Sequence, residues 1–455
     1  MTNKIFDDSF IWGTATSSYQ IEGAIMEGGR GESIWDRFCQ VPKAIDDNSN
    51  GDEACDHYNR YGSDIKMIRD LGFKYYRFSI AWPRIQPTGT GPANQPGLDF
   101  YSALVDELLK NGLTPCVTLY HWDLPQVLED RGGWPVRDTA LAFVEYADIV
   151  SKHLGDRVKL WTTHNEPWCA SMLGYHEGRH APGRTNLRDA VAASHHMLLS
   201  HGLSVPVIRG NVKDAQIGIV LNPVPGVPAS PSEADKDAHR KFDGVFNRWY
   251  LDSLYKGHYP QDVLEDFSKD ASFEGKDFSF IQDGDNDLIK APTDFLGINY
   301  YSRGLISADP EADAPGKIPD PGPEMRTDMD WEVYPTGLYD LLKRIHDDYK
   351  PGQLFITENG AAYSESPDED GRVRDHRRTS YIHGHLLAVK RAIADGVPVG
   401  GYFVWSLLDN FEWSFGYTKR FGIVYVDYET QERYPKDSAY WFKSMMTDPN
   451  TKLAD

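Results

Sequence analysis

Short apolar runs rich in β-branched and aromatic residues alternate along this chain with longer segments of helical periodicity. The alternation is typical of βα units, in which each strand of a parallel sheet is followed by a helix. The eight runs span residues 10–15, 75–82, 114–121, 158–165, 216–222, 294–300, 353–358 and 401–408. Because eight strands close a (β/α)8 barrel, the sequence predicts an α/β protein of the TIM-barrel type with long βα loops.

The length of 455 residues would allow about three domains of ordinary size. A stretch rich in proline and acidic residues at 307–324 resembles a linker, but the seventh and eighth strands follow it and are needed to close the barrel. We therefore expect one catalytic domain over residues 1–455, with 307–324 as a long loop after the sixth strand.

The net charge of the chain disfavours some classes of binding partner. Acidic residues number 68 against 47 basic ones, a net charge of −21, which repels phosphate backbones and anionic lipid. Neither a nucleic acid nor a membrane is expected, and a small uncharged molecule fits better. The many aromatic rings either stack on the faces of sugars or fill the core, and composition does not choose between these readings.

The ends of the chain and its cysteines predict a cytoplasmic location. Four scattered cysteines, Cys39, Cys55, Cys116 and Cys169, form no C-x-x-C pair, so neither a disulfide framework nor a cysteine metal site is expected. Asp7 and Asp8 stand where a signal peptide needs apolar residues, and no apolar run reaches 18 residues. Whether the chain forms a homo-oligomer stays open.

Barrel enzymes carry their catalytic residues at the carboxyl ends of the strands. Two glutamates stand at such ends, Glu166 in THNEPW directly after the run 158–165, and Glu358 in ITENG as the last residue of the run 353–358. Burial there would shift their pKa values, although a single glutamate at a strand end is more often a cap or an ion-pair partner. Two carboxylates that flank a sugar bond are the machinery of glycoside hydrolysis.

Other chemistries find weaker support in the sequence. Residues 176–180 (HEGRH) match the zinc motif H-E-x-x-H, but Gly174 and Gly178 interrupt the segment and Pro182 follows it, so we expect a loop rather than a zinc-binding helix. The G-x-S-x-G, P-loop and G-x-G-x-x-G motifs are absent, and the sequence predicts neither a metal nor a cofactor. Cys169, beside NEPW, is expected to pack rather than to act as a nucleophile.

Seven segments together resemble glycoside hydrolase family 1, the β-glucosidases. They are FIWGTATSSYQIEG (10–23), YRFSIAWPR (76–84), TLYHWDLP (118–125), THNEPW (163–168), NYYS (299–302), ITENG (356–360) and WSLLDNFEW (405–413). The resemblance runs in order from about residue 6 to Trp441. It implies a retaining mechanism with Glu358 as nucleophile and Glu166 as acid/base, their carboxyls about 5–5.5 Å apart.

The resemblance also implies roles for the surrounding residues. Arg77 and Tyr301 would keep Glu358 ionised. Asn165 would contact the sugar 2-hydroxyl, and we include it among the catalytic residues for that reason. Gln20, His121, Glu412 and Trp413 would bind the other hydroxyls of the sugar, with Trp405 as a stacking floor and Trp122 beside it. Asn222, Trp168, His180 and Trp331 would surround the leaving group.

The activity implied is exo-hydrolysis of terminal non-reducing β-D-glucosyl residues from β-glucosides and cello-oligosaccharides, as in cellulose and other polysaccharide breakdown. A carboxylate at Glu412 would repel a sugar phosphate. The alternatives are a β-galactosidase, a β-fucosidase or a 6-phospho-β-glycosidase on the same scaffold, or a non-catalytic sugar-binding barrel.

Overall fold

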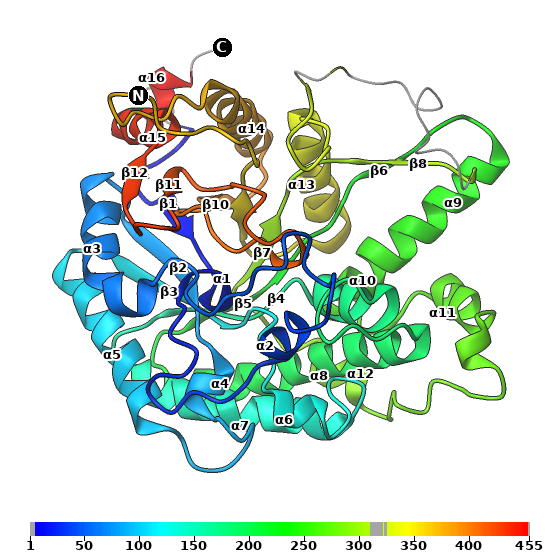
Figure 1. Ribbon diagram of the computed structural model, residues 1–455. Coiled ribbons are helices and arrows are strands. Elements are labelled where there is room, and N and C mark those ends of the chain that lie inside the picture. The colour runs from blue at the N-terminus through cyan, green and yellow to red at the C-terminus, as the bar shows by residue number, and fades with distance from the viewer. Residues whose placement is uncertain (1–4, 310–321, 323–324, 454–455) are drawn as a thin grey trace.

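The computed structural model describes residues 5–309, 322 and 325–453, and its central feature is a closed parallel barrel (Figure 1). The barrel strands are β1 (Ile11–Ala15), β2 (Tyr75–Ser79), β3 (Thr114–Tyr120), β4 (Leu160–Asn165), β5 (Gln216–Leu221), β7 (Phe295–Asn299), β9 (Leu354–Asn359) and β10 (Val399–Trp405). They pair in sequence order, and β1 closes the ring against β10. The predicted (β/α)8 fold is confirmed.

Helices surround the barrel (Figure 1). The longer ones are α3 (His57–Asp70), α5 (Gln95–Lys110), α7 (Arg137–Leu154), α8 (Leu187–Asn211), α9 (Glu233–Asp243), α13 (Pro335–Tyr349), α14 (His376–Ala394) and α15 (Asp437–Thr447). The shorter ones are α1 (Ser18–Ile21), α2 (Ile34–Phe38), α4 (Trp82–Ile85), α6 (Gln126–Glu129), α10 (Trp249–Tyr255), α11 (Gln261–Ser268), α12 (Asp285–Ile289) and α16 (Pro449–Lys452). No helix within the described residues is both long and apolar enough to cross a membrane.

The predicted strand boundaries differ most from the structure in the second and the last strand. The run 75–82 stops as a strand at Ser79, because Trp82 begins α4 with a proline in its first turn. The last strand begins at Val399 and ends at Trp405, whereas the sequence predicts 401–408.

The acidic stretch 307–324 follows a small sheet outside the barrel. β8 (Gly304–Ile306) pairs in parallel with β6 (Gly226–Pro228). The predicted loop begins directly after β8, and its residues 310–321 and 323–324 lie outside the described residues. A second small sheet pairs β11 (Val424–Val426) with β12 (Arg433–Pro435).

A buried ion cluster anchors the loop that follows β10. The carboxylate of Asp409 accepts hydrogen bonds from Lys436 Nζ at 2.8 Å, from Arg420 Nη1 at 2.9 Å and from the backbone N–H of Gly422 at 2.9 Å. Asp409 and Lys436 are fully buried. Because the same loop carries Glu412, this cluster fixes one wall of the cavity described below.

Replacing Lys436 by methionine is expected to lower the free energy of unfolding by about 3 kcal/mol, since it leaves the buried Asp409 carboxylate without one of its two cations. Denaturant unfolding measures the effect. Methionine at the exposed Lys443 is the control, with an expected change within about 0.5 kcal/mol. Equal stabilities of the two variants would contradict the assigned anchoring role.

Candidate active site

A cavity of about 360 Å³ opens where the barrel strands end, and many of the predicted residues line it. Its predicted lining residues are His121, Trp122, Glu166, Trp168, His180, Asn222, Tyr301, Trp331, Glu358, Trp405, Glu412 and Trp413. Gln20, Arg77 and Asn165 are buried and form hydrogen bonds to residues of the lining. The structure therefore brings together the whole predicted set.

Glu358 lies in β9 between a cation and a phenol. Arg77 Nη1 donates to Glu358 Oε1 at 2.7 Å, and the Tyr301 hydroxyl donates to Oε2 at 2.6 Å. Arg77 and Glu358 are buried and Tyr301 is partly buried, and the two carboxylate oxygens each have a donor. These are the partners that the resemblance implies for a carboxylate kept ionised.

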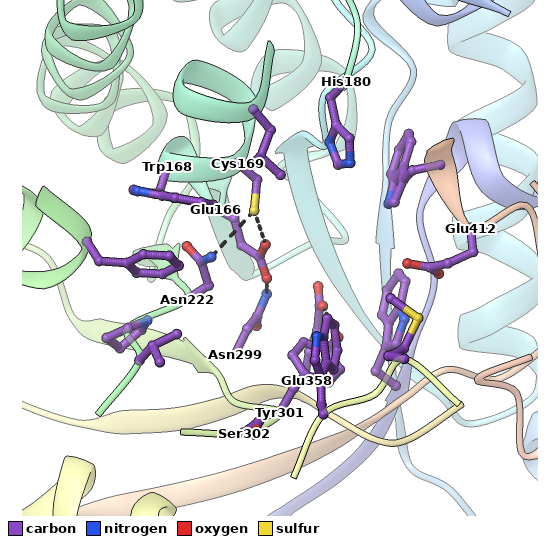
Figure 2. Close-up of a pocket in the computed structure, with 18 of the residues that line it drawn as sticks. Glu166, Trp168, Cys169, His180, Asn222, Asn299, Tyr301, Ser302, Glu358 and Glu412 are labelled. Carbon is purple, nitrogen blue, oxygen red and sulfur yellow. Dashed lines mark hydrogen bonds between the residues drawn. The ribbon is translucent and has the colours of Figure 1, made fainter. Parts of the chain in front are cut away.

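Glu166 directly follows β4 and has neutral hydrogen-bond donors. Asn299 Nδ2 donates to Oε1 at 2.6 Å, and the Cys169 thiol donates to Oε2 at 3.0 Å (Figure 2). The backbone of Glu166 is left-handed, with φ of +47°, a conformation that costs a non-glycine residue about 1–3 kcal/mol. The fold thus holds this carboxyl in a strained backbone position that aims it into the cavity.

The two carboxyls differ in their electrostatic surroundings. Burial, together with the nearby charge of Glu358, raises the pKa of Glu166 to about 7. Burial also raises the pKa of Glu358, but the charge and hydrogen bond of Arg77 and the hydrogen bond of Tyr301 lower it. Because the Arg77 guanidinium contacts Glu358 and not Glu166, Glu358 ionises at a lower pH than Glu166, and Glu166 keeps its proton when Glu358 is already ionised.

This order predicts the pH dependence of activity. If Glu166 must be protonated to act as an acid, kcat/KM should fall by tenfold per pH unit above the Glu166 pKa of about 7. On the acid side, kcat/KM should fall as Glu358 takes up a proton. A pH–rate profile on a β-glucoside measures both limbs, and an alkaline limb that is absent up to pH 9 would contradict the assignment of Glu166.

Asn165 connects the two halves of the site. Its Oδ1 accepts from Arg77 Nη2 at 2.7 Å and from Asn299 Nδ2 at 3.1 Å, and its Nδ2 lies 3.1 Å from His121 Nε2. Burial holds the pKa of His121 well below its usual value, so the ring is neutral and its Nε2 accepts this bond. A contact between Asn165 and a sugar 2-hydroxyl stays a prediction.

Aromatic rings form a stacked group at the end of the cavity where Trp405 and Trp413 lie. The His121 ring lies 5.7 Å from Trp405 and 5.9 Å from Trp413, nearly parallel to both. Trp122 packs against Trp413 at 4.5 Å, and both have positive φ, of +78° and +50°. Their rings are therefore held by packing and by a constrained backbone rather than free to move.

Glu412 behaves differently from the expectation of a fixed negative charge. Burial, with added effects of Glu358 and Glu166, raises its pKa to about 8, and Gln20 Nε2 lies 3.4 Å from its Oε2. The raised pKa favours the protonated carboxyl, which can both donate and accept hydrogen bonds. The repulsion of a sugar phosphate by Glu412 stays a prediction.

The other end of the cavity has an apolar wall that the sequence did not reveal. Trp168 stacks on Phe246 at 3.9 Å, and Phe242 stacks on Phe246 at 5.2 Å. Both phenylalanines line the cavity. They come from α9 and from a π-helical turn over Gly244–Arg248, between β5 and β7, so a search of strand ends could not find them.

The predicted loop at 176–180 is confirmed for residues 178–180, whereas His176 and Glu177 form the end of a helix that begins after NEPW. A π-helix spans Cys169–Glu177 and ends at Gly178, whose φ is +73°. The wider turn accommodates the glycines, and π-helical turns frequently occur at functional sites. His176 is exposed whereas His180 is buried in the cavity wall, and within the described residues no three His, Cys, Asp or Glu side chains are placed to hold a metal ion.

A closed (β/α)8 barrel with two buried, differently paired carboxyls at its mouth defines the class of the glycoside hydrolases. Comparison with known proteins agrees, because the sequence profile of Glycosyl hydrolase family 1 matches residues 2–451. The chain belongs to Glycosyl hydrolase family 1.

Three relatives illustrate the likeness. Beta-glucosidase A of Acetivibrio thermocellus is 48% identical over 448 residues, covering 98% of this chain and 99% of that protein. A bifunctional beta-D-glucosidase/beta-D-fucosidase of Bifidobacterium breve is 44% identical over 471 residues, covering 98% of this chain and 99% of that protein. The structure of the family 1 β-glucosidase from Thermotoga maritima has a TM-score of 0.92 at 46% identity, covering 99% of this chain and all of that one.

Proposed function

We propose that this protein is a retaining, exo-acting β-glucosidase that hydrolyses terminal non-reducing β-D-glucosyl residues. The observation that carries the proposal is the pair of buried carboxyls in one cavity, of which Glu358 contacts a cation and Glu166 contacts neutral donors only. Full-length similarity to proteins named β-glucosidases supports the choice of sugar.

The reaction runs in two displacements. Glu166 gives its proton to the glycosidic oxygen while Glu358 attacks the anomeric carbon, so the leaving group departs as a neutral alcohol and a glycosyl ester forms. Esterification removes the negative charge of Glu358, which lowers the pKa of Glu166. Ionised Glu166 then takes a proton from water as the water oxygen attacks the same carbon, and the sugar leaves with its configuration retained.

The remaining predicted residues have places in this scheme. We assign the glycone to the region of Trp405, Trp413 and Glu412, with Gln20 and His121 behind them, and Asn165 to the 2-hydroxyl. The leaving group would lie against Trp168, with Asn222, His180 and Trp331 around it. The carboxyl separation of about 5–5.5 Å stays a prediction.

The stereochemistry of the first product tests the proposal. Proton NMR of hydrolysis should show the β-anomer of glucose before mutarotation produces the α-anomer, because two inversions restore the configuration. Release of the α-anomer first would contradict the retaining mechanism. No glucose from any aryl β-glucoside, with measurable glucose binding, would instead support a non-catalytic barrel.

β-Fucoside hydrolysis is the second candidate activity, since a relative of 44% identity carries both activities in its name. D-Fucose differs from D-glucose in two ways, since it lacks the 6-hydroxyl and its 4-hydroxyl is axial, while the 2- and 3-hydroxyls stay available for the same contacts. Comparing kcat/KM on the aryl β-glucoside, β-fucoside, β-galactoside and 6-phospho-β-glucoside ranks these substrates and separates the alternatives.

The cysteines and the barrel topology bear on the location and the domain organisation of the protein. All four cysteines are free thiols, which supports the proposed cytoplasmic location. Every strand of the barrel contributes to one fold between residues 11 and 405, which supports one catalytic domain over residues 1–455. Cello-oligosaccharides from cellulose breakdown are the proposed natural substrates.

A further inference from the structure

The cysteine beside the acid/base glutamate is bonded to it. Cys169 opens the π-helix after β4, and its thiol lies 3.0 Å from Glu166 Oε2. Asn222, at the end of β5, donates its Nδ2 proton to the same sulfur at 3.4 Å. Figure 2 shows the chain of contacts from Asn222 through the sulfur to the Glu166 carboxyl, with Asn299 on the opposite oxygen.

The directions of these bonds decide where the Glu166 proton resides. Asn299 Nδ2 can only donate, so Glu166 Oε1 accepts its hydrogen bond at 2.6 Å. A proton on Oε1 that pointed toward Asn299 would clash with the donated proton. The proton therefore belongs on Oε2. Because the sulfur of Cys169 accepts from Asn222, its S–H points away from Asn222 and toward Oε2.

We propose that Cys169 is a positioning residue for the reaction, whose thiol, oriented by Asn222, holds Oε2 of Glu166 as the oxygen that gives up and takes back the proton. The inference rests on the proposed glycosidase function. In this scheme Asn222, besides lining the cavity, orients the Cys169 thiol by donating a hydrogen bond to its sulfur.

The properties of a thiol suit this role. An S–H group is a weak donor, so it can orient the carboxyl and stabilise its ionised form without preventing protonation in the next turnover. Burial and the neighbouring Glu166 hold the pKa of Cys169 well above its usual value, so the thiol remains a neutral donor. The charged groups that act on this pair are Glu358, Arg77 and Glu412, which interact with Glu166, and Arg179 and Glu358, which act on the thiol.

The test compares two leaving groups in Cys169→Ala. Phenyl β-glucoside needs a proton on its leaving oxygen, whereas dinitrophenyl β-glucoside does not. We expect kcat/KM to fall about fivefold on the phenyl substrate, the effect of one weak hydrogen bond, and to stay within about twofold on the dinitrophenyl substrate. The alkaline limb of the phenyl profile should move up by about half a pH unit, because the ionised form loses a donor.

Cys169→Ser and Cys55→Ala complete the design. Serine keeps a hydrogen-bond donor, so the ratio of kcat/KM on the two substrates should equal that of the wild type. The alkaline limb of its pH–rate profile should lie at the same pH or lower. Cys55 is a buried thiol that donates to the Asp409 carbonyl at 3.1 Å rather than to Glu166. Its alanine variant should lose stability without changing the ratio of the two substrates.

Several results would overturn the inference. Equal losses on both substrates in Cys169→Ala, with an unmoved alkaline limb, would reduce Cys169 to packing. If Cys169→Ala does not fold, Cys169→Ser takes its place in the test. A fivefold loss of Cys169→Ser on the phenyl substrate alone, the result expected of alanine, would also contradict the proposed role. A wild type that hydrolyses neither substrate would refute the glycosidase function itself, a separate failure.

A spectroscopic readout is independent of turnover. The S–H stretching band of Cys169, assigned by its loss in Cys169→Ser, should shift to lower frequency as Glu166 ionises, because a carboxylate is the stronger acceptor. The shift should be absent in Glu166→Gln. A band that does not change across the titration would contradict the proposed bond.

Discussion

Replacing Glu358 by glutamine is expected to lower kcat on an aryl β-glucoside by more than about a thousandfold, because the amide cannot form the glycosyl ester. The substitution is nearly isosteric, so Arg77 and Tyr301 keep a polar neighbour and the barrel should still fold. Steady-state kinetics at the pH optimum, with circular dichroism to confirm folding, measure the effect. Activity within tenfold of wild type would remove Glu358 from the mechanism.

The chain supplies a matched control for this variant. Glu22 is also a buried glutamate with one arginine and one tyrosine partner, Arg84 Nε at 2.7 Å and the Tyr101 hydroxyl at 2.6 Å. It does not line the cavity. Glu22→Gln should lower stability while leaving kcat within a few-fold, so a large loss in Glu358→Gln alone separates chemistry from the cost of disturbing a buried ion pair.

Replacing Glu166 by alanine is expected to lower kcat/KM on phenyl β-glucoside by about 10²–10⁴-fold, the usual contribution of general acid catalysis. The first step on dinitrophenyl β-glucoside should be nearly unaffected, because its leaving group departs without a proton. The second step still lacks its base, so the glycosyl ester should accumulate. A burst of dinitrophenol followed by a slow steady rate is the expected time course.

A small anionic nucleophile provides the decisive control for Glu166. Azide needs no deprotonation, so it should speed the steady rate of Glu166→Ala on dinitrophenyl β-glucoside and yield a β-glycosyl azide. The wild type should show no comparable increase. Equal losses on both substrates without rescue by azide would mean that the variant disturbs the site as a whole, and Glu166 would lose its assigned role.

Much of the site was predictable because barrel geometry places the carboxyl ends of all strands at one mouth. Glu166 and Glu358 stand at the ends of the fourth and seventh predicted strands, and that position alone indicates partial burial. Cys169 shows where such reasoning stops. Its distance from Glu166 along the chain predicts only proximity, and the thiol bond depends on the π-helix Cys169–Glu177, which was not predicted from the sequence.

The apolar wall and Glu412 required the tertiary structure for different reasons. Phe246 reaches the cavity from a helical insertion between two strands, and no pattern in the sequence connects it with Trp168. The charge of Glu412 depends on how completely it is buried and on two other carboxyls in the same cavity. Residue type indicates an acid, whereas its pKa is a property of the surroundings.

The sequence by itself determined the barrel, the order of its strands and the two glutamates at its mouth, because hydrophobic periodicity and strand ends are local features of the chain. Only the tertiary structure decided which carboxyl contacts the cation Arg77, which contacts the Asn299 amide and the Cys169 thiol, and how each is tuned. Those pairings join residues from different strands, and their strength depends on burial, which no local pattern encodes.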